Sequence, residues 1–266
     1  MNGTLFGDHM RKIRKLTLAA SMAATFALSA FASSAANAGT IQLGFILDES
    51  GSIGSSNWNI IKAGLSNAVN NLIPLNSNYE ISVVTFSSSA TADIQNFLVT
   101  DAASRTSLAT SIANLGYSGG GTNFTAAFDT MRTTLAASTL NIDFSYVNFA
   151  TDGVTSNEAT AITARNNLIA AGVDNISIEG IGSGVDTAYL QNSICYPGPC
   201  DTTSPYNFPT QGFYIGVANA TAYAAAIENK IRVVTQPNNT VPEPASLALT
   251  GLGLFGIAMS RRRKAA

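Results

Sequence analysis

Five oxygen-bearing side chains stand where they could bind one metal ion together. Asp48 and Asp152 each follow directly after an apolar run, and Ser50 and Ser52 come at alternate positions after Asp48. Thr122 follows three consecutive glycines, a stretch in which the backbone turns freely. Carboxylates and hydroxyls without histidine or cysteine are hard oxygen ligands, which suit Mg²⁺ or Ca²⁺ better than zinc or copper. The residue types therefore predict a divalent-metal site.

The strands that precede these residues must be neighbours if the site is to form. Apolar, strand-like runs alternate with helical patterns, which indicates an α/β fold with a mainly parallel sheet. Because the carboxyl ends of parallel strands lie at one edge, Asp48 and Asp152 are expected to be neighbours. The expected strands are 41–47, 79–86, 91–97, 142–150, 173–181 and 213–217. The expected helices cover about 58–72, 101–114, 123–137, 157–171 and 223–234.

Local signals delimit some of these elements. Ser55 or Ser56 is expected to cap the first helix, and Gly172 is expected to end the helix over 157–171. The link between strands 79–86 and 91–97 is a short serine-rich turn, which predicts an antiparallel hairpin.

The stretch 186–211 departs from the alternation and carries four prolines and both cysteines. Cys195 and Cys200 flank Tyr-Pro-Gly-Pro, a turn-forming sequence, so a local disulfide is expected in an oxidising compartment. We expect this stretch to be an insertion that covers one edge of the domain, and it suggests no functional site.

Composition excludes several classes of function. The only histidine is His9, so the body of the chain has no imidazole for Ser-His-Asp or Cys-His catalysis or for the common zinc sites. Residues 39–240 carry six basic and fourteen acidic side chains, a formal net charge of −8. A nucleic-acid partner, which would require a basic patch, is therefore not expected.

Residues 1–38 have the features of a secretory signal peptide. Basic residues precede an apolar run over 16–31, and the A-x-A pattern at 36–38 predicts a mature chain that begins at Gly39. An N-terminal membrane anchor is the alternative, but the run is shorter than the roughly 20 residues of a spanning helix.

The C-terminal end carries a second targeting segment, after a polar linker over 236–240. Pro242-Glu243-Pro244 precedes an apolar stretch over 245–260, and three arginines and a lysine follow. This order resembles the PEP-CTERM sorting signal of exported proteins of Gram-negative bacteria, over residues 241–266. The resemblance implies recognition by an exosortase, a transient inner-membrane anchor and delivery to the cell envelope or beyond it. A plain C-terminal membrane anchor with a basic stop is the alternative.

The metal-site residues fall into three short motifs. Asp48-Glu49-Ser50-Gly51-Ser52 matches DxSxS, and Gly121-Thr122 and Thr151-Asp152-Gly153 follow in the expected order. Together they resemble the metal-ion-dependent adhesion site (MIDAS) of von Willebrand factor A (VWA) domains, over about 41–234. By this resemblance Ser50, Ser52 and Thr122 offer hydroxyls to the metal, and Asp48 and Asp152 act directly or through water. The resemblance also implies a VWA domain over 39–235. Its fold would be a doubly wound, Rossmann-like α/β fold with helices on both faces and one antiparallel edge strand.

Each fragment alone has a plainer interpretation. The segment 48–52 could be an ordinary polar loop between a strand and a helix, and the agreement of three fragments is what favours a site. Glu49 is expected to be a solvated neighbour of the metal ligands. The run 180–184, Gly-Ile-Gly-Ser-Gly, lacks the full dinucleotide-binding spacing and is interpreted as a turn.

The resemblance implies a binding protein. In such a domain Mg²⁺, with Mn²⁺ or Ca²⁺ as alternatives, bridges to an acidic residue of a protein partner. The alternative is a structural component of the extracellular matrix, because PEP-CTERM tails accompany exopolysaccharide production. A metal-dependent enzyme is not expected, since no general base of the usual types stands near the motifs.

Overall fold

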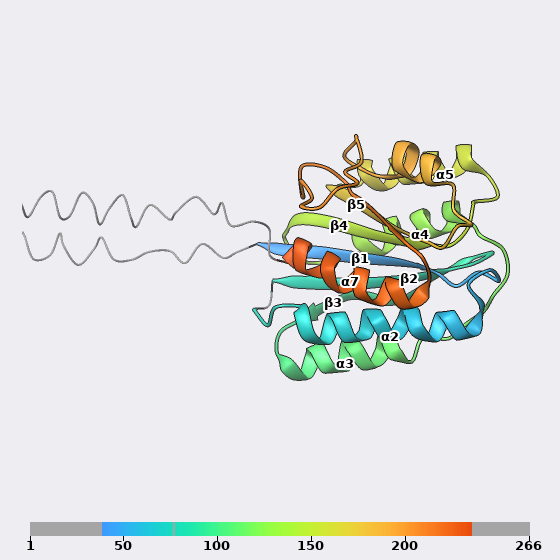
Figure 1. The fold of residues 1–266 in the computed structure, drawn as a ribbon. Coiled ribbons are helices and arrows are strands. Elements are labelled where there is room, and N and C mark those ends of the chain that lie inside the picture. Colours follow the sequence, from blue (N-terminus) through green and yellow to red (C-terminus); the bar gives the residue numbers. More distant parts are fainter. Residues whose placement is uncertain (1–38, 77, 236–266) are drawn as a thin grey trace, which may run out of the picture. The chain divides into compact units, whose positions relative to one another are not determined.

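The computed structural model describes residues 39–76 and 78–235 (Figure 1). Six strands form one sheet in the order β3-β2-β1-β4-β5-β6. The strands are β1 (Thr40–Asp48), β2 (Tyr79–Phe86), β3 (Ala90–Val99), β4 (Ile142–Thr151), β5 (Asn175–Ile181) and β6 (Tyr214–Val217). All pairings are parallel except that of β2 with the edge strand β3. The predicted mainly parallel sheet with one antiparallel edge strand is confirmed.

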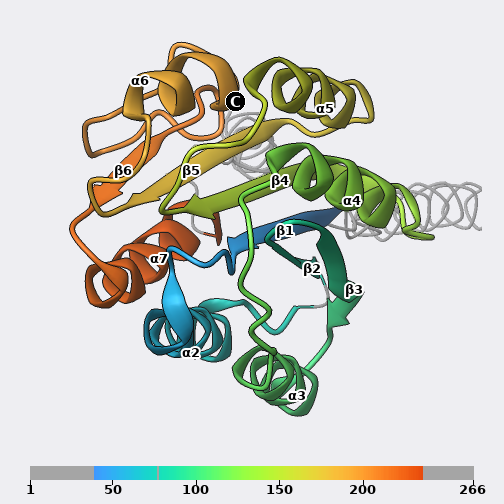
Figure 2. The ribbon, with the colours of Figure 1, turned by 90° about the vertical axis from the view of Figure 1, so that its right-hand side faces the viewer.

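Helices cover both faces of the sheet. They are α2 (Gly54–Leu72), α3 (Ala102–Ala113), α4 (Phe124–Ala136), α5 (Glu158–Ala170) and α7 (Ala220–Thr235). Figure 2 shows α2, α3 and α7 on one face and α4 and α5 on the other. A separate apolar cluster fills each of the two layers. β1 and β2 are buried on both faces from Gln42 and Tyr79 onward, which explains their nearly continuous apolar sequences.

One predicted helix cap is wrong and the other is confirmed. The residue before α2 is Ile53, whose side chain caps nothing, so Ser55 and Ser56 lie inside the first turn. At the end of α5, Gly172 has a φ of +109° and its N–H donates to the carbonyl of Ile169 at 2.9 Å. A glycine just beyond the last helical residue adopts this left-handed backbone without a steric penalty.

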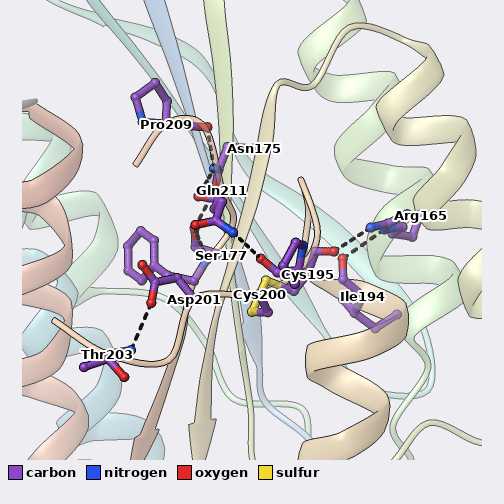
Figure 3. The surroundings of a disulfide bond; sticks show 12 residues. Arg165, Asn175, Ser177, Ile194, Cys195, Cys200, Asp201, Thr203, Pro209 and Gln211 are labelled. Atoms are coloured by element: carbon purple, nitrogen blue, oxygen red, sulfur yellow. Dashed lines mark hydrogen bonds between the residues drawn. A yellow bond between two sulfur atoms is a disulfide. The ribbon is translucent and has the colours of Figure 1, made fainter. Parts of the chain in front are cut away.

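The stretch that departs from the alternation packs beside β5. It contains α6 (Thr187–Tyr189) and a short π-helical turn, η2 (Leu190–Ile194), and Tyr196 pairs with Ile176 in an isolated bridge. The predicted disulfide between Cys195 and Cys200 is present (Figure 3). Arg165 of α5 donates to the carbonyls of Ile194 and Cys195 at 2.9 and 2.6 Å, so this segment is held to the α5 face of the sheet.

The expected leader (1–38), linker (236–240) and tail (241–266) lie outside the described residues. Within the described part of the chain, no helix combines the length and the apolar character that a membrane span requires.

Candidate metal centre

The sheet brings the two aspartates to one edge, as the sequence predicts. Asp48 is the last residue of β1, and Asp152 follows Thr151, the last residue of β4. β1 and β4 are parallel neighbours, with Leu47 opposite Ala150, so both strands end side by side. The two serines and Thr122 lie in the loops that lead into α2 and α4. We refer below to these five residues, Asp48, Ser50, Ser52, Thr122 and Asp152, as the five-residue centre.

Four members of the centre form a continuous chain of polar contacts. The backbone N–H of Ser50 donates to Asp48 Oδ1 at 2.8 Å. Ser50 Oγ lies 3.0 Å from Ser52 Oγ, and Ser52 Oγ donates to Asp152 Oδ1 at 2.7 Å. Oxygens from two separate loops therefore converge at the edge of the sheet.

Thr122 lies next to Gly153, close to this chain of contacts. A Cβ added to Gly153 would be 3.3 Å from Thr122 Oγ1 and 3.8 Å from Ser52 Oγ. The following residue, Asn123, accepts a hydrogen bond from the N–H of Ala126 and caps α4, which fixes where the loop ends. The structure thus places Thr122 at the same edge as the other four residues.

Glycines allow the loops to approach each other closely. The N–H of Gly51 donates to the carbonyl of Gly120 at 2.8 Å. Gly120 has a φ of +103°, and a Cβ there would lie only 2.8 Å from Ser88 Oγ. A larger residue at position 120 would meet both a strained backbone and a steric clash. The glycine run before Thr122 therefore shapes the loop that presents this threonine.

Glu49 is buried, so its predicted position as a solvated neighbour of the metal ligands is wrong. Its side chain is buried, with Oε2 accepting from the N–H of Ser118 at 2.9 Å and Oε1 from Ser118 Oγ at 2.7 Å. The hydroxyl of Tyr117 also donates to the carbonyl of Ser50 at 3.2 Å. Glu49 therefore joins the serine loop to the glycine loop. Its sequence neighbours give no signal of this, because the contact depends on how a distant loop folds back.

Thr151 is a further residue that supports the centre. It is fully buried, and its hydroxyl donates to Asp48 Oδ2 at 2.6 Å. With Ser50 bound to Oδ1, both oxygens of the Asp48 carboxylate are oriented. The sequence offers one signal for this role, since Thr151 immediately precedes Asp152 at the end of its strand.

Burial disfavours the charged forms of the two carboxylates, Asp48 and Asp152. Desolvation raises the pKa of Asp48 to about 6, against the hydrogen bonds from Ser50 and Thr151, and the nearby charge of Asp152 contributes to the rise. Burial also raises the pKa of Asp152. Across residues 39–76 and 78–235, neither carboxylate forms a salt bridge with a basic side chain. Such a pair would be stabilised by a bound cation.

The donor set fits a hard divalent cation. It comprises two carboxylates and three hydroxyls, and the described residues contain no cluster of three or more His, Cys, Asp or Glu side chains. Oxygen-only donors are typical of Mg²⁺, Mn²⁺ and Ca²⁺. Asp48 and Ser50 are buried, whereas Ser52 is exposed and Asp152 is partly exposed. The centre therefore has an inner side held by the fold and an outer side open to solvent.

Comparison with sequence families gives two matches. The von Willebrand factor type A domain matches residues 42–212, and the PEP-CTERM protein-sorting motif matches residues 240–264. No curated protein is similar enough to the chain to count as a relative.

Several solved structures share the fold. Proximal thread matrix protein 1 from the mussel byssus, with a zinc-occupied MIDAS motif, is 18% identical with a TM-score of 0.57. The match covers 74% of this chain and 46% of the mussel protein, so the chain spans less than half of that protein's length. Manganese-loaded TRAP protein of Plasmodium vivax is 24% identical with a TM-score of 0.52, covering 72% and 73% of the two chains. The pilus adhesin SpaC of Lactobacillus rhamnosus GG is 13% identical with a TM-score of 0.58, covering 75% and 31%.

Proposed function

The chain belongs to the von Willebrand factor type A family, and from this we propose that it is an exported adhesion module with a divalent metal at the five-residue centre. The proposed metal is Mg²⁺, with Mn²⁺ or Ca²⁺ as alternatives. The observation that carries the proposal is the polar chain from Ser50 Oγ through Ser52 Oγ to Asp152 Oδ1, at 3.0 and 2.7 Å. The zinc-occupied mussel protein and the manganese-loaded TRAP protein support a divalent metal in this fold.

The residues of the centre have different roles in binding the metal. Ser50, Ser52 and Thr122 provide hydroxyl oxygens, and Asp48 and Asp152 provide negative charge directly or through water. Thr151 and the N–H of Ser50 orient Asp48, and Glu49 holds the serine loop against the glycine loop. When bound, the metal supplies a positive charge with a coordination position for an acidic group of a partner. Because Ser52 and Asp152 face solvent, a partner could reach that position.

Replacing Thr151 with valine is expected to weaken Mg²⁺ binding about 10- to 100-fold, the usual effect of removing a group that orients a metal ligand. Valine keeps the shape of threonine but removes the hydroxyl that donates to Asp48 Oδ2. Isothermal titration calorimetry of the two proteins measures the change. Thr163→Val, at an exposed position of α5, is the matched control and is expected to bind as the parent does. Equal affinities for Thr151→Val and the parent would contradict the orienting role.

Adhesion can be tested with the surface fraction of the producing bacterium. The immobilised protein is expected to retain material from this fraction in Mg²⁺, to release it with a chelator and to recover binding when Mg²⁺ is restored. Asp152→Ala is expected to retain nothing under any of these conditions. Retention that is unaffected by both the chelator and the substitution would contradict metal-dependent adhesion.

A structural component of an extracellular matrix is the second candidate function. The PEP-CTERM motif, together with the likeness to a byssus matrix protein, favours it. Such a component would co-purify with exopolysaccharide even in the presence of chelator, whereas an adhesin bound through the metal would be released. The same experiment therefore separates the two candidates. Both are binding roles, and we propose no catalysis for this chain.

The PEP-CTERM motif indicates a secreted protein that an exosortase sorts. We further propose that the tail is a transient inner-membrane anchor in a Gram-negative bacterium and that the mature protein lacks the segment beyond about Pro244. The apolar stretch 245–260 is shorter than the roughly 20 residues of a stable span, and the basic residues after it would stay on the cytoplasmic side. Intact-mass measurement of surface-extracted protein checks this prediction. A mass that includes residues 261–266 would instead indicate a plain membrane anchor.

A further inference from the structure

A second polar cluster lies between the sheet and α7. Its members are Asn148 of β4, Glu179 of β5 and Lys230 of α7, which are 5%, 0% and 3% exposed. Charged residues are rarely buried this deeply unless they are paired. Even a paired burial costs free energy, because both charges lose their hydration. The proposed adhesion function uses none of the three residues.

The carboxylate of Glu179 contacts both other groups. Its Oε1 lies 3.0 Å from Lys230 Nζ, and its Oε2 accepts from Asn148 Nδ2 at 2.6 Å. A primary amine and a carboxamide are therefore held by the two oxygens of one carboxylate. Lys230 Nζ also lies over the ring of Phe213, 5.0 Å from its centroid, so an aromatic face contacts the amine.

The cluster has unused bonding capacity and some room to move. Asn148 Oδ1 is buried and has no hydrogen-bond partner among the described residues. Asn148 and Lys230 both line a small cavity of about 20 Å³, together with aromatic, aliphatic and polar side chains that include Tyr146 and Phe208. Buried polar atoms are normally satisfied, so an orphaned carbonyl beside an amine calls for an explanation.

The protonation states suit a reaction between the amine and the amide. Burial lowers the pKa of Lys230 to about 8, although the charge of Glu179 opposes this, and burial raises the pKa of Glu179. Both shifts favour transfer of a proton from the ammonium to the carboxylate. An uncharged amine is the nucleophilic form of lysine.

We propose that Lys230 and Asn148 become joined by an intramolecular isopeptide bond, with Glu179 as the group that transfers protons between them. The Lys230 Nζ–Asn148 Cγ bond forms and the Asn148 Cγ–Nδ2 bond breaks, so one ammonia leaves. Of the three protons of the lysine ammonium, one stays on the new amide nitrogen, one departs with the ammonia and one remains on Glu179. No oxidant, reductant or other reactant is required.

Three physical features favour this step. The fold already holds the reacting groups near each other, so the reaction does not need to bring them together from solution and avoids that entropic cost. Nζ must approach Cγ to about 3–3.5 Å, and both side chains border the same small cavity. The protonated form of Glu179 can donate to the carbonyl oxygen of Asn148 after the amide turns about its Cβ–Cγ bond, which would stabilise the developing oxyanion.

The bond would connect α7 to the centre of the sheet. β4 ends at the metal centre, whereas α7 is the last element of the domain before the linker to the tail. A covalent link between them closes a long loop of chain, and cross-links of long loops constrain the unfolded state most. The product would also remove the buried charge pair.

Mass spectrometry of the full-length chain tests the proposal. The denatured and fully reduced protein is digested with trypsin, and Asn148 is expected in a branched peptide that joins residues 133–165 to the segment ending at Arg232. Its mass should be lower than the sum of the two peptides by one ammonia. Separate peptides, with cleavage after Lys230 and an unmodified Asn148, would overturn the proposal.

Two variants identify the role of each group. Glu179→Gln keeps the size of the side chain but cannot transfer the proton, so the branched peptide should be lost, while a circular dichroism spectrum like that of the parent shows that the chain folds. Lys62→Met removes a lysine that bonds to the carbonyl of Leu115 elsewhere and should leave the branched peptide unchanged. A branched peptide that persists in Glu179→Gln would contradict the proposed role of Glu179. If this variant does not fold, the measurement on the parent protein still decides whether the bond exists.

Discussion

Replacing Asp48 or Asp152 with alanine is expected to abolish the binding of Mg²⁺ and Mn²⁺. Each substitution removes one of the two negative charges of the five-residue centre, and among the described residues no cluster of three or more His, Cys, Asp or Glu side chains offers another site for the metal. Removing a group that merely orients a metal ligand costs about 10- to 100-fold in affinity, and losing a carboxylate ligand should cost more. Calorimetric titration of purified protein should therefore show no heat of binding for either variant.

Asp129→Ala is the matched control for these variants. Asp129 is a partly exposed carboxylate on α4 that pairs with Arg132 at 3.6 Å, so its loss changes the net charge equally without touching the centre. Because Asp48 also accepts from Thr151 and Ser50, thermal melts of each variant establish that the protein is folded at the temperature of titration. If both alanine variants titrated like the parent, the proposed coordination would be wrong.

Phe149→Ala is expected to lower the free energy of unfolding by about 3–5 kcal/mol, the usual cost of removing a fully buried phenylalanine. Phe149 is the centre of an aromatic cluster, with ring centroids 5.6 Å from Phe86, 4.7 Å from Phe124 and 5.0 Å from Phe128. The edge-to-face contact with Phe124 adds to the loss of buried area. Urea denaturation measures the change.

This cluster also underlies the metal centre. Phe86 ends β2, Phe149 lies three residues before Asp152, and Phe124 lies two residues after Thr122. The same aromatic contacts therefore fix the strand ends and the glycine loop relative to one another. Phe144→Ala, at a residue of β4 that is 48% exposed and stacks on Tyr146, is the control and should lower the free energy of unfolding by about 1 kcal/mol, well below the loss in Phe149→Ala. Equal losses in the two variants would show that the cluster has no special role.

The sequence predicts the sheet and the position of the centre because both depend on local patterns. Apolar runs of the right length identify the strands, and the parallel arrangement places the ends of β1 and β4 side by side. The motif residues directly follow these strands. Their convergence at one edge therefore follows from chain order and strand direction, without knowledge of any tertiary contact.

Contacts between distant loops could not be predicted in this way. The burial of Glu49 depends on the glycine loop folding back so that Ser118 reaches its carboxylate, across 69 positions of sequence. The predicted serine cap of α2 is wrong for a related reason. Ile53 is buried, and the helix begins at Gly54, before either serine. Tertiary packing outweighs local propensity at such positions.

The cluster of Asn148, Glu179 and Lys230 shows the same limit more strongly. Each of the three polar residues is buried in a different strand or helix, and a buried polar residue carries no sequence signal of its partner. Only the register of β4 with β5 and the placement of α7 bring the three side chains together. The chemistry proposed for them follows from the three-dimensional structure alone.

Anomalous X-ray diffraction from crystals of the protein grown with Mn²⁺ tests the central claim most directly. The proposed centre predicts one strong peak at the carboxyl edge of β1 and β4, within coordination distance of the hydroxyl oxygens of Ser50 and Ser52. The peak should also lie within reach of Thr122, Asp48 and Asp152, directly or through water. A map with no peak at this edge, or with its main peak at other side chains, would contradict the proposed metal centre and the adhesion mechanism that depends on it.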